Sequence, residues 1–193
     1  TICLPSNASA ERKNILKSLG AELILTSPLE GTDGAQIVAK ETYAANPDKY
    51  FYADQYSNDA NWQAHYLTTA EEIWTQTKGK ITHFVAGLGT TGTFVGTARR
   101  LKELGNVQLI SLQPDHPFHP LEGWKHLATA HRPGIYDDTL ADKTLVIDSS
   151  GVFDMIKSIS IHERLFISPS GAANLLGALE VASQIKEGDI VTT

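Results

Sequence analysis

Apolar residues in this chain alternate between helical and strand-like spacing along most of its length. In Ser9–Leu19 the apolar residues Ile15, Leu16 and Leu19 share a helical spacing, and Gly20 follows as a usual helix stop. The same reasoning predicts helices at 34–45, 62–77, 94–104, 152–163 and 171–186, and strands at 1–5, 21–25, 50–52, 81–86, 107–112, 144–148, 165–168 and 189–192. This order predicts an α/β fold, with a doubly wound parallel sheet between two layers of helices.

Two details of this pattern carry further expectations. In the helix at 34–45 we expect Ile37, Val38 and Tyr43 to form the inner face. The alternation then breaks at QPDHPFHPLEGW (113–124), which has three prolines and two histidines, and no periodic pattern returns until about Thr144. A long irregular segment of this kind is usually functional or mobile.

Composition excludes several classes of protein. The chain has 193 residues, of which 41% are hydrophobic, so it can bury a sizeable core. Its net charge is −6 and it has no basic block, so we expect neither nucleic acid nor a membrane as a partner. The single cysteine, Cys3, fits a reducing compartment and a cytoplasmic protein. Both ends read as strands cut short, so we expect a truncated chain.

The stretch GLGTTGT (87–93) lies between a predicted strand and a predicted helix. Glycine amides can converge on an anion in such a turn, and the positive end of the helix dipole adds to the attraction. Three hydroxyl groups suit a terminal phosphate monoester. The glycines and threonines concerned are Gly87, Gly89, Gly92, Thr90, Thr91 and Thr93.

Other interpretations of this turn stay open from the residues alone. The spacing also fits G-x-G-x-x-G, the dinucleotide fingerprint, which needs an acidic residue at the end of the next strand. That strand is expected to end at Leu112–Gln113, so Asp115 comes late. A Walker loop would need lysine after Gly92, where Thr93 stands. The remaining interpretation is a glycine-rich turn that binds no ligand.

Two further segments carry polar residues where strands and helices meet. Ser170 follows Pro169 at a strand-to-helix turn, where its hydroxyl either contacts a ring nitrogen of a flat ligand or simply caps the helix. Gln55 stands at the end of a predicted strand, where open parallel sheets bind ligands. His65 lies nearby in ANWQAHYLTTAEEIW and is expected to be a half-buried helix residue with a satisfied hydrogen bond.

Taken together, these motifs resemble the fold type II pyridoxal-phosphate enzymes, whose fold is like that of the tryptophan synthase β subunit. GTTGT after a strand, DQ-x(6)-W-x-x-HYLTT-x-E-E-I-W before it and SPSGAAN near the end occur in the family's order. LPSNASAERKNILKSLGAELILT, EGWKHL and PGIYDDTLAD also have counterparts. Within the family the chain is most similar to the B type of cysteine synthase, or O-acetylserine sulfhydrylase, over nearly all of its length.

The resemblance implies a function and a set of site residues. The implied reaction is cysteine biosynthesis, in which acetate leaves O-acetylserine and sulfide or another sulfur donor takes its place. Gln55 and Gly123 would contact the amino-acid substrate, and Ser170, with Ser168 as the alternative, would contact the pyridine nitrogen of pyridoxal 5'-phosphate. The phosphate would be bound by Gly89, Thr90, Thr91, Gly92 and Thr93.

The chain also departs from the family. The family's Schiff-base lysine belongs to a segment ahead of Thr1, and none of the lysines present falls in its motif, so no catalytic residue is expected in this chain and it is expected to be inactive alone. Residues 1–57 would be the remainder of the small subdomain and residues 58–193 an incomplete large, cofactor-binding domain. The family implies a homodimer. O-phosphoserine and cystathionine-type substrates share these motifs and stay open.

Two rival functions from other classes also remain open. One is a dinucleotide-dependent oxidoreductase, and the other is a non-catalytic phosphate-ligand-binding or regulatory module. His116, His119, His126 and His131 show no regular ligand spacing, so we do not expect a metal site. Trp124 is expected to be a packing residue close to the supposed site.

Overall fold

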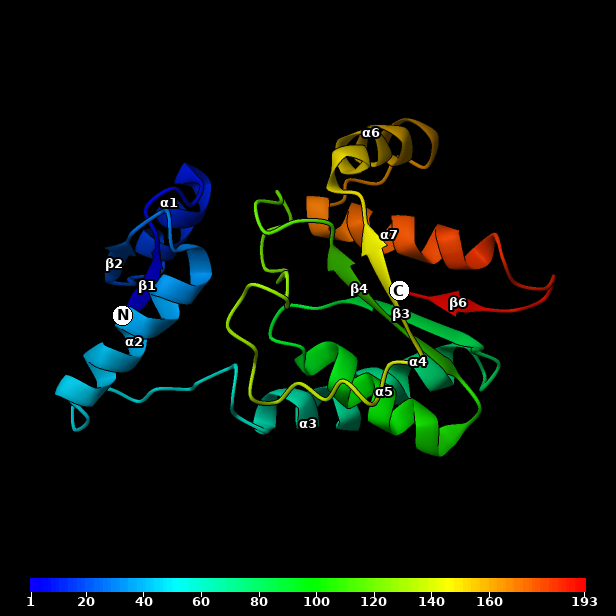
Figure 1. The fold of residues 1–193 in the computed structure, drawn as a ribbon, viewed down its shortest axis with the longest axis horizontal. Coiled ribbons are helices and arrows are strands. Elements are labelled where there is room, and N and C mark those ends of the chain that lie inside the picture. Colours follow the sequence, from blue (N-terminus) through cyan, green and yellow to red (C-terminus); the bar gives the residue numbers. More distant parts are fainter. The chain divides into compact units, whose positions relative to one another are not determined.

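The computed structural model describes all residues from Thr1 to Thr193, and it divides into two compact units, Thr1–Asp54 and Gln55–Thr193. The first unit holds a parallel pair of strands, β1 and β2, with α2 packed against both (Figure 1). Its elements are β1 (Ile2–Pro5), α1 (Ala10–Ser18), β2 (Leu23–Thr26) and α2 (Gly31–Ala45).

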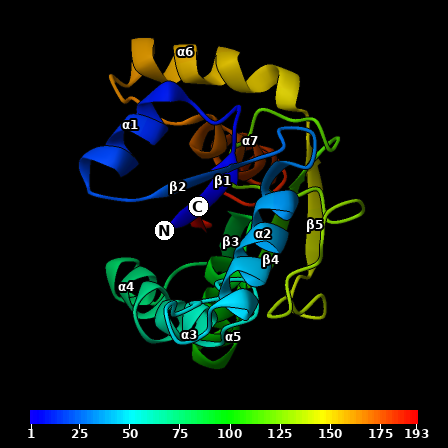
Figure 2. The ribbon, with the colours of Figure 1, turned by 90° about the vertical axis from the view of Figure 1, so that its left-hand side faces the viewer.

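The second unit is built on a four-stranded sheet in the order β5-β4-β3-β6, in which every pair of neighbours is parallel. Helices α6 and α7 lie on one side of this sheet and α3, α4 and α5 on the other (Figures 1 and 2). The predicted α/β fold with helices on both faces of a parallel sheet is therefore confirmed. The elements are α3 (Ala60–Leu67), α4 (Thr69–Gln76), β3 (His83–Gly87), α5 (Gly92–Leu104), β4 (Gln108–Pro114), β5 (Lys143–Ile147), the 3-10 turn η1 (Ser149–Gly151), α6 (Val152–His162), α7 (Pro169–Ala182) and β6 (Val191–Thr192).

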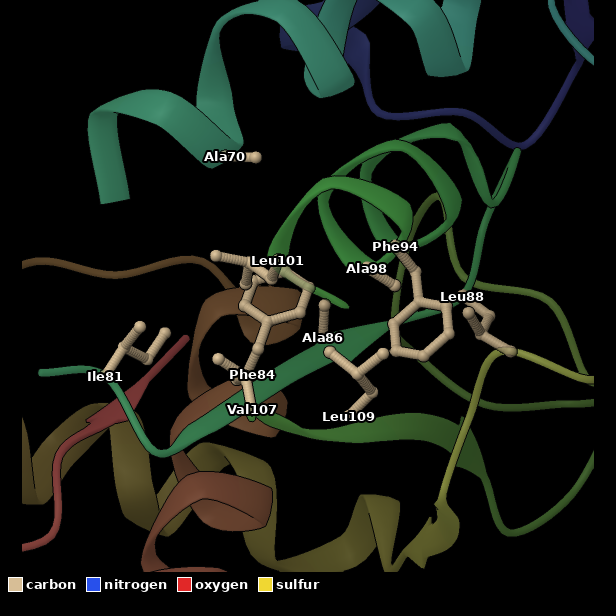
Figure 3. Close-up of a cluster of buried hydrophobic side chains, with 10 residues drawn as sticks. All are labelled: Ala70, Ile81, Phe84, Ala86, Leu88, Phe94, Ala98, Leu101, Val107 and Leu109. Carbon is tan, nitrogen blue, oxygen red and sulfur yellow. The ribbon is translucent and has the colours of Figure 1, made fainter. Parts of the chain in front are cut away.

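Two hydrophobic clusters lie on the two faces of this sheet, because successive side chains of a strand point to opposite faces. Phe84 of β3 faces α5, where its ring stacks on Phe94 with centroids 6.2 Å apart, and Ala70 of α4 joins the same cluster (Figure 3). Val85, the next residue of β3, belongs to the other cluster together with Ala172 of α7. Buried strand residues and small helix residues thus hold the helices close to both faces of the sheet.

Several predicted elements are absent or differ in the structure. Residues 50–52 and 165–168 form no strands, and Phe51 and Phe166 are 90% and 92% exposed. A short aromatic or aliphatic run becomes a strand only when a neighbouring strand can pair with it, and neither run has one. The helix predicted at 62–77 is two helices, because Thr68 leaves helical geometry (φ −123°) while its hydroxyl donates to the carbonyl of Ala64.

The inner face of α2 was also predicted wrongly. Ile37 and Tyr43 are 57% and 38% exposed, whereas Gly34, Ala35 and Gln36 are buried. Small residues at the start of the helix allow its closest approach to the strands, and this outweighs the larger apolar side chains further along.

The segment between β4 and β5 is irregular, as predicted, but its backbone is tied down at several points. Lys125 donates its N–H to the carbonyl of Leu88, and Ile135 donates to the carbonyl of Tyr56. Leu121 and Ile135 are buried. The segment therefore packs as part of the second unit without any periodic pattern. None of the helices is long and apolar enough to cross a membrane.

Candidate functional site

The glycine turn lies at the carboxyl ends of β3 and β4. Strand β3 ends at Gly87 and α5 begins at Gly92, while the N–H of Leu88 donates to the carbonyl of Leu112 on β4. Thr91, just before α5, has a left-handed backbone (φ +73°), which is unusual for a β-branched residue. Strain of this kind is commonly kept where a turn must hold its amides in a fixed direction.

The three hydroxyl groups of the turn have different surroundings. Thr91 is 3% exposed, and its Oγ1 atom has no hydrogen-bond partner within the protein. Thr90 accepts a hydrogen bond from the side-chain amide of Asn61 at 3.1 Å. The hydroxyl of Thr93 lies 3.2 Å from Nε2 of His65. Two of these hydroxyls are thus held by α3, and the third is buried without a protein partner.

These features fit an anionic group such as a phosphate monoester. The side chain of Thr91, just before α5, makes no capping hydrogen bond, so the positive end of the helix dipole is available there, and the N–H of Gly92 lies 3.4 Å from Oγ1 of Thr90. A buried hydroxyl without a partner is costly unless something else satisfies it, and the Oγ1 atom of Thr91 is such a group. Residues 89–93 can therefore donate hydrogen bonds to an anion, and none of them has a carboxylate that would repel it.

The loop that carries Gly123 lies against this turn. A Cβ atom at Gly89 would collide with the backbone carbonyl of Gly123, and one at Gly87 would collide with the indole of Trp124. Gly123 itself has φ +89°, a conformation that favours glycine. The structure thus brings together Gly89 and Gly123, which are far apart in sequence, and it makes Trp124 the packing residue that the sequence predicted.

Helix α7 meets the same end of β3. The backbone N–H of Gly87 donates to Oδ1 of Asn174 at 2.9 Å. Ser170 lies one helical turn before Asn174, and residues four apart share one face of a helix. Ser170 therefore stands on the helix face that meets the carboxyl end of β3. Asn174 was not singled out from the sequence, although an amide side chain inside the apolar run GAANLLGALEVA was a signal for it.

The helix-cap interpretation of Ser170 is wrong. The residue that caps α7 is Ser168, whose Oγ accepts from the N–H of Gly171 at 3.1 Å. The hydroxyl of Ser170 lies 3.0 Å from that of Ser168. Pro169 takes the first helical position, so the helix begins two residues earlier than the sequence predicts.

Gln55 is joined to the glycine turn through Asn61. Its backbone carbonyl accepts from the Asn61 side chain at 2.7 Å, and the same amide reaches Thr90. Gln55 is exposed and stands at the start of the second unit. Asn61 was missed by the sequence analysis, because its partners are recognisable only once α3 is placed beside the turn.

His65 is half-buried on α3, and both of its ring nitrogens have hydroxyl neighbours, as the sequence predicted in general terms. Nδ1 lies 2.9 Å from Oγ1 of Thr69, and Nε2 faces Thr93. Burial lowers the pKa of His65 below its ordinary value. A neutral imidazole with one donor and one acceptor is therefore the form that this position favours.

Asp115 does not stand where the sequence analysis placed it. Strand β4 extends to Pro114, so Asp115 follows it directly. Its carboxylate accepts from the backbone and hydroxyl of Ser149, at 3.3 and 2.8 Å. Burial would raise the pKa of Asp115, but these hydrogen bonds, with the nearby His116, outweigh burial and lower it. The carboxylate thus ties the ends of β4 and β5 together.

The histidines of the irregular segment stabilise its turns. Nδ1 of His116 accepts from the N–H of Phe118, and Nδ1 of His119 accepts from the N–H of Leu121, each at 3.1 Å. No group of three histidine, cysteine or acidic side chains in the chain is arranged to hold a metal ion. Burial, with His116 and His126 nearby, lowers the pKa of His119, although Asp115 acts in the opposite direction.

A parallel α/β sheet with a glycine- and threonine-rich turn after β3 is a common arrangement in enzymes that bind a phosphate-bearing cofactor, and comparison with known proteins agrees. All of residues 1–193 match the family model described as pyridoxal-phosphate dependent enzyme. The chain belongs to this family. The cysteine synthase of Entamoeba histolytica superposes with a TM-score of 0.87 at 31% identity, over 98% of this chain and 58% of that one. The O-acetylserine dependent cystathionine beta-synthase of Helicobacter pylori gives 0.90 and 31%, over 98% and 63%.

Sequence relatives point to one branch of the family. The cysteine synthase of Aquifex aeolicus is 45% identical over 99% of this chain and 60% of its own length. Cysteine synthase B of Escherichia coli is 36% identical over 98% of this chain and 62% of its own length. The chain is thus homologous to pyridoxal-phosphate dependent cysteine synthases, which confirms the resemblance drawn from the motifs. It spans about 60% of the length of these curated relatives.

Proposed function

We propose that this chain carries the cofactor-phosphate site and part of the substrate site of a cysteine synthase. The observation that carries the proposal is the buried hydroxyl of Thr91, which has no protein partner and stands on a strained turn at the open start of α5. A phosphate oxygen is the kind of acceptor that such a donor requires. Gly89, Thr90, Gly92 and Thr93 complete the proposed phosphate site.

The remaining site residues are proposed because they lie around this turn. Ser170 is proposed to face the pyridine nitrogen of pyridoxal 5'-phosphate, because it lies on the face of α7 that meets β3. A neutral hydroxyl there would leave the nitrogen unprotonated. When bound, the cofactor supplies an electron sink for elimination at the β carbon of an amino acid, and the protein supplies orientation. Thr90 and Thr93 would hold the cofactor by its phosphate.

Gln55 and Gly123 are proposed to contact the amino-acid substrate. Gln55 is tied to the phosphate turn through Asn61, and Gly123 lies directly against Gly89. The proposed substrates are O-acetylserine and sulfide, as in the cysteine synthases to which the chain is similar. O-phosphoserine and cystathionine-type substrates are the alternatives, and a comparison of their turnover by the complete enzyme would distinguish them.

We propose further that none of the lysines in these 193 residues forms the Schiff base, so that the chain binds cofactor without completing the reaction. In this proposal residues 1–57 belong to the small subdomain and residues 58–193 to the large, cofactor-binding domain, and the protein is a cytoplasmic homodimer. The proposal that the large domain is incomplete is supported by the relatives, because this chain covers 60% and 62% of the length of two of them.

Titration with pyridoxal 5'-phosphate followed by borohydride reduction tests this function. We expect saturable binding of pyridoxal 5'-phosphate, much weaker binding of pyridoxal, and no lysine labelled after reduction and peptide mass analysis. Thr91→Val keeps the side-chain shape but removes the hydroxyl, and should weaken binding about tenfold. Thr97→Val is the matched control, since Thr97 is also buried but lies inside α5.

Each contrary outcome identifies a different error. A single lysine fixed to the cofactor would contradict the proposal that the chain lacks the Schiff-base residue. Binding of NAD instead of pyridoxal 5'-phosphate would favour a dinucleotide-dependent oxidoreductase. Equal affinity for pyridoxal and its phosphate would contradict the phosphate site at residues 89–93.

A further inference from the structure

The side-chain amide of Asn61, on α3, lies between two segments of the candidate site. Its Nδ2 atom donates to the backbone carbonyl of Gln55 at 2.7 Å and to Oγ1 of Thr90 at 3.1 Å. A Cβ atom at Gly92 would collide with this amide, so the glycine lets α3 approach the turn. One planar group thus joins the segment proposed for the substrate to the turn proposed for the phosphate.

Chemistry fixes the direction of both hydrogen bonds. A backbone carbonyl can only accept, so the Asn61 atom facing Gln55 has to be the nitrogen. That nitrogen has two hydrogens, and the second points to the Thr90 hydroxyl, which therefore accepts. The backbone N–H of Gly92, which can only donate, lies 3.4 Å from the same Thr90 oxygen. Both lone pairs of this oxygen are then directed at donors.

We propose that Asn61 is a positioning residue that makes Thr90 a dedicated hydrogen-bond donor to the cofactor phosphate. With both lone pairs used, the hydroxyl of Thr90 has only its hydrogen left to offer, and the tetrahedral oxygen directs it away from Asn61 and Gly92. An oxyanion accepts that hydrogen, whereas a cation finds no acceptor there. This inference rests on the proposed function, because it assigns a role within the same phosphate site.

The same arrangement links the two halves of the site. If the Asn61 amide turned over, its oxygen would face the carbonyl of Gln55, and two acceptors would be left in contact. Asn61 therefore has one favourable orientation, which it imposes on Thr90 without touching the ligand. Asn61 should therefore affect phosphate binding only by orienting the hydroxyl of Thr90.

A double-mutant cycle on binding of pyridoxal 5'-phosphate tests the proposal. Thr90→Val should weaken binding about tenfold, because it removes a donor to a charged group, and Asn61→Ala should weaken it by up to the same factor, because the donor loses its orientation. The double variant should bind no more weakly than Thr90→Val, because Asn61 acts only through the hydroxyl. Affinity for pyridoxal, which has no phosphate, should not change. Additive losses, or an equal loss for pyridoxal, would overturn the role of Asn61.

A second variant covers the case in which Asn61→Ala folds poorly. Asn61→Asp has nearly the same shape, but its ionised carboxylate accepts from Thr90 and turns the hydroxyl hydrogen away from the phosphate. The loss of affinity should therefore grow as the pH is raised through the range in which a carboxyl group ionises, near 4. A loss that is independent of pH would indicate a packing role and would contradict the proposal.

The control is Asn58→Ala, at the start of the same helix. The Oδ1 atom of Asn58 accepts from the N–H of Ala60, the first residue of α3, at 3.0 Å. The Asn58→Ala variant should bind pyridoxal 5'-phosphate with the same affinity as the unaltered protein. Wild-type protein that binds neither pyridoxal 5'-phosphate nor inorganic phosphate would refute the proposed function itself. Wild-type binding with an unaffected Asn61→Ala variant would refute this inference alone.

Discussion

At the scale of single residues, the candidate site is made of neutral hydrogen-bonding groups whose protonation and direction are set by their neighbours. The hydroxyls of Thr90 and Thr93 are within reach of an amide and an imidazole on α3, and the hydroxyl of Thr91 has no partner within the protein. The sequence identified these threonines because glycine and hydroxyl residues in a strand–helix turn are a local signal. It did not identify Asn61, whose bond to Thr90 joins residues 29 positions apart.

Two histidines give the protein a defined dependence of stability on pH. Burial lowers the pKa of His65 and of His119, for which His116 and His126 add to the effect and Asp115 opposes it. The unfolded chain takes up protons near the ordinary pKa of about 6.5, while the folded state does so only at lower pH. The contribution of these two histidines to the free energy of unfolding should therefore be fully present above pH 6.5. It should be lost as the pH is lowered through that value.

Urea unfolding at pH 7.5, 6.5 and 5.5 measures this effect. The double variant His65→Gln and His119→Gln should show a flatter dependence than the unaltered protein, and His162→Gln, on the exposed side of α6, controls for the loss of a histidine. Carboxylates with lowered pKa, such as Asp115 and Asp137, lose their contributions only at lower pH and do not interfere. Identical curves for all three proteins would contradict the assignment.

At the scale of elements, the start of α7 separates two serines that the sequence left undecided. Ser168 caps the helix, while Ser170 lies within its first turn on the side of β3. The sequence prediction was wrong about where this helix begins. The run 165–168 looked like a strand by composition, but no strand is present to pair with it, and proline at the first helical position moved the cap to Ser168.

Alanine substitutions at these two serines should therefore affect different quantities. The change at Ser168 should affect stability, and the change at Ser170 should affect the spectrum of the bound cofactor. Ser168→Ala loses the cap and should lower the free energy of unfolding by about 1 kcal/mol in urea titrations. Ser170→Ala should change stability by less than about 0.5 kcal/mol but should alter the absorption spectrum of bound pyridoxal 5'-phosphate. The reverse pattern would assign the pyridine contact to Ser168.

At the scale of the whole molecule, the two units differ in how much they bury. Both hydrophobic clusters belong to Gln55–Thr193, whereas Leu4 and Ala35 are the buried hydrophobic residues of Thr1–Asp54. Three buried polar atoms without partners also lie in the first unit, on Thr26, Gln36 and Asp54. A unit with few buried apolar contacts opens at low free-energy cost.

Native-state hydrogen exchange should reveal this difference directly. We expect the amides of β1 and β2 to exchange at least about 100-fold faster than those of β3 and β4, after correction for intrinsic rates, which corresponds to a gap of about 2.7 kcal/mol. Peptide-resolved mass spectrometry of the 193-residue chain provides the measurement. Equal protection in both sheets would mean that the two units unfold together.

What the sequence determined by itself were the local features: the alternation of helices and strands, the parallel sheet class, the glycine-rich turn at 87–93 between a strand and a helix, and the family motifs. These are readable because periodicity and turn chemistry depend on residues close together in the chain. The tertiary structure decided which distant residues meet, such as Gly123 with Gly89, Asn174 with Gly87 and Asn61 with Thr90. It also decided which apolar runs become strands, because pairing and burial depend on neighbours that a local pattern does not specify.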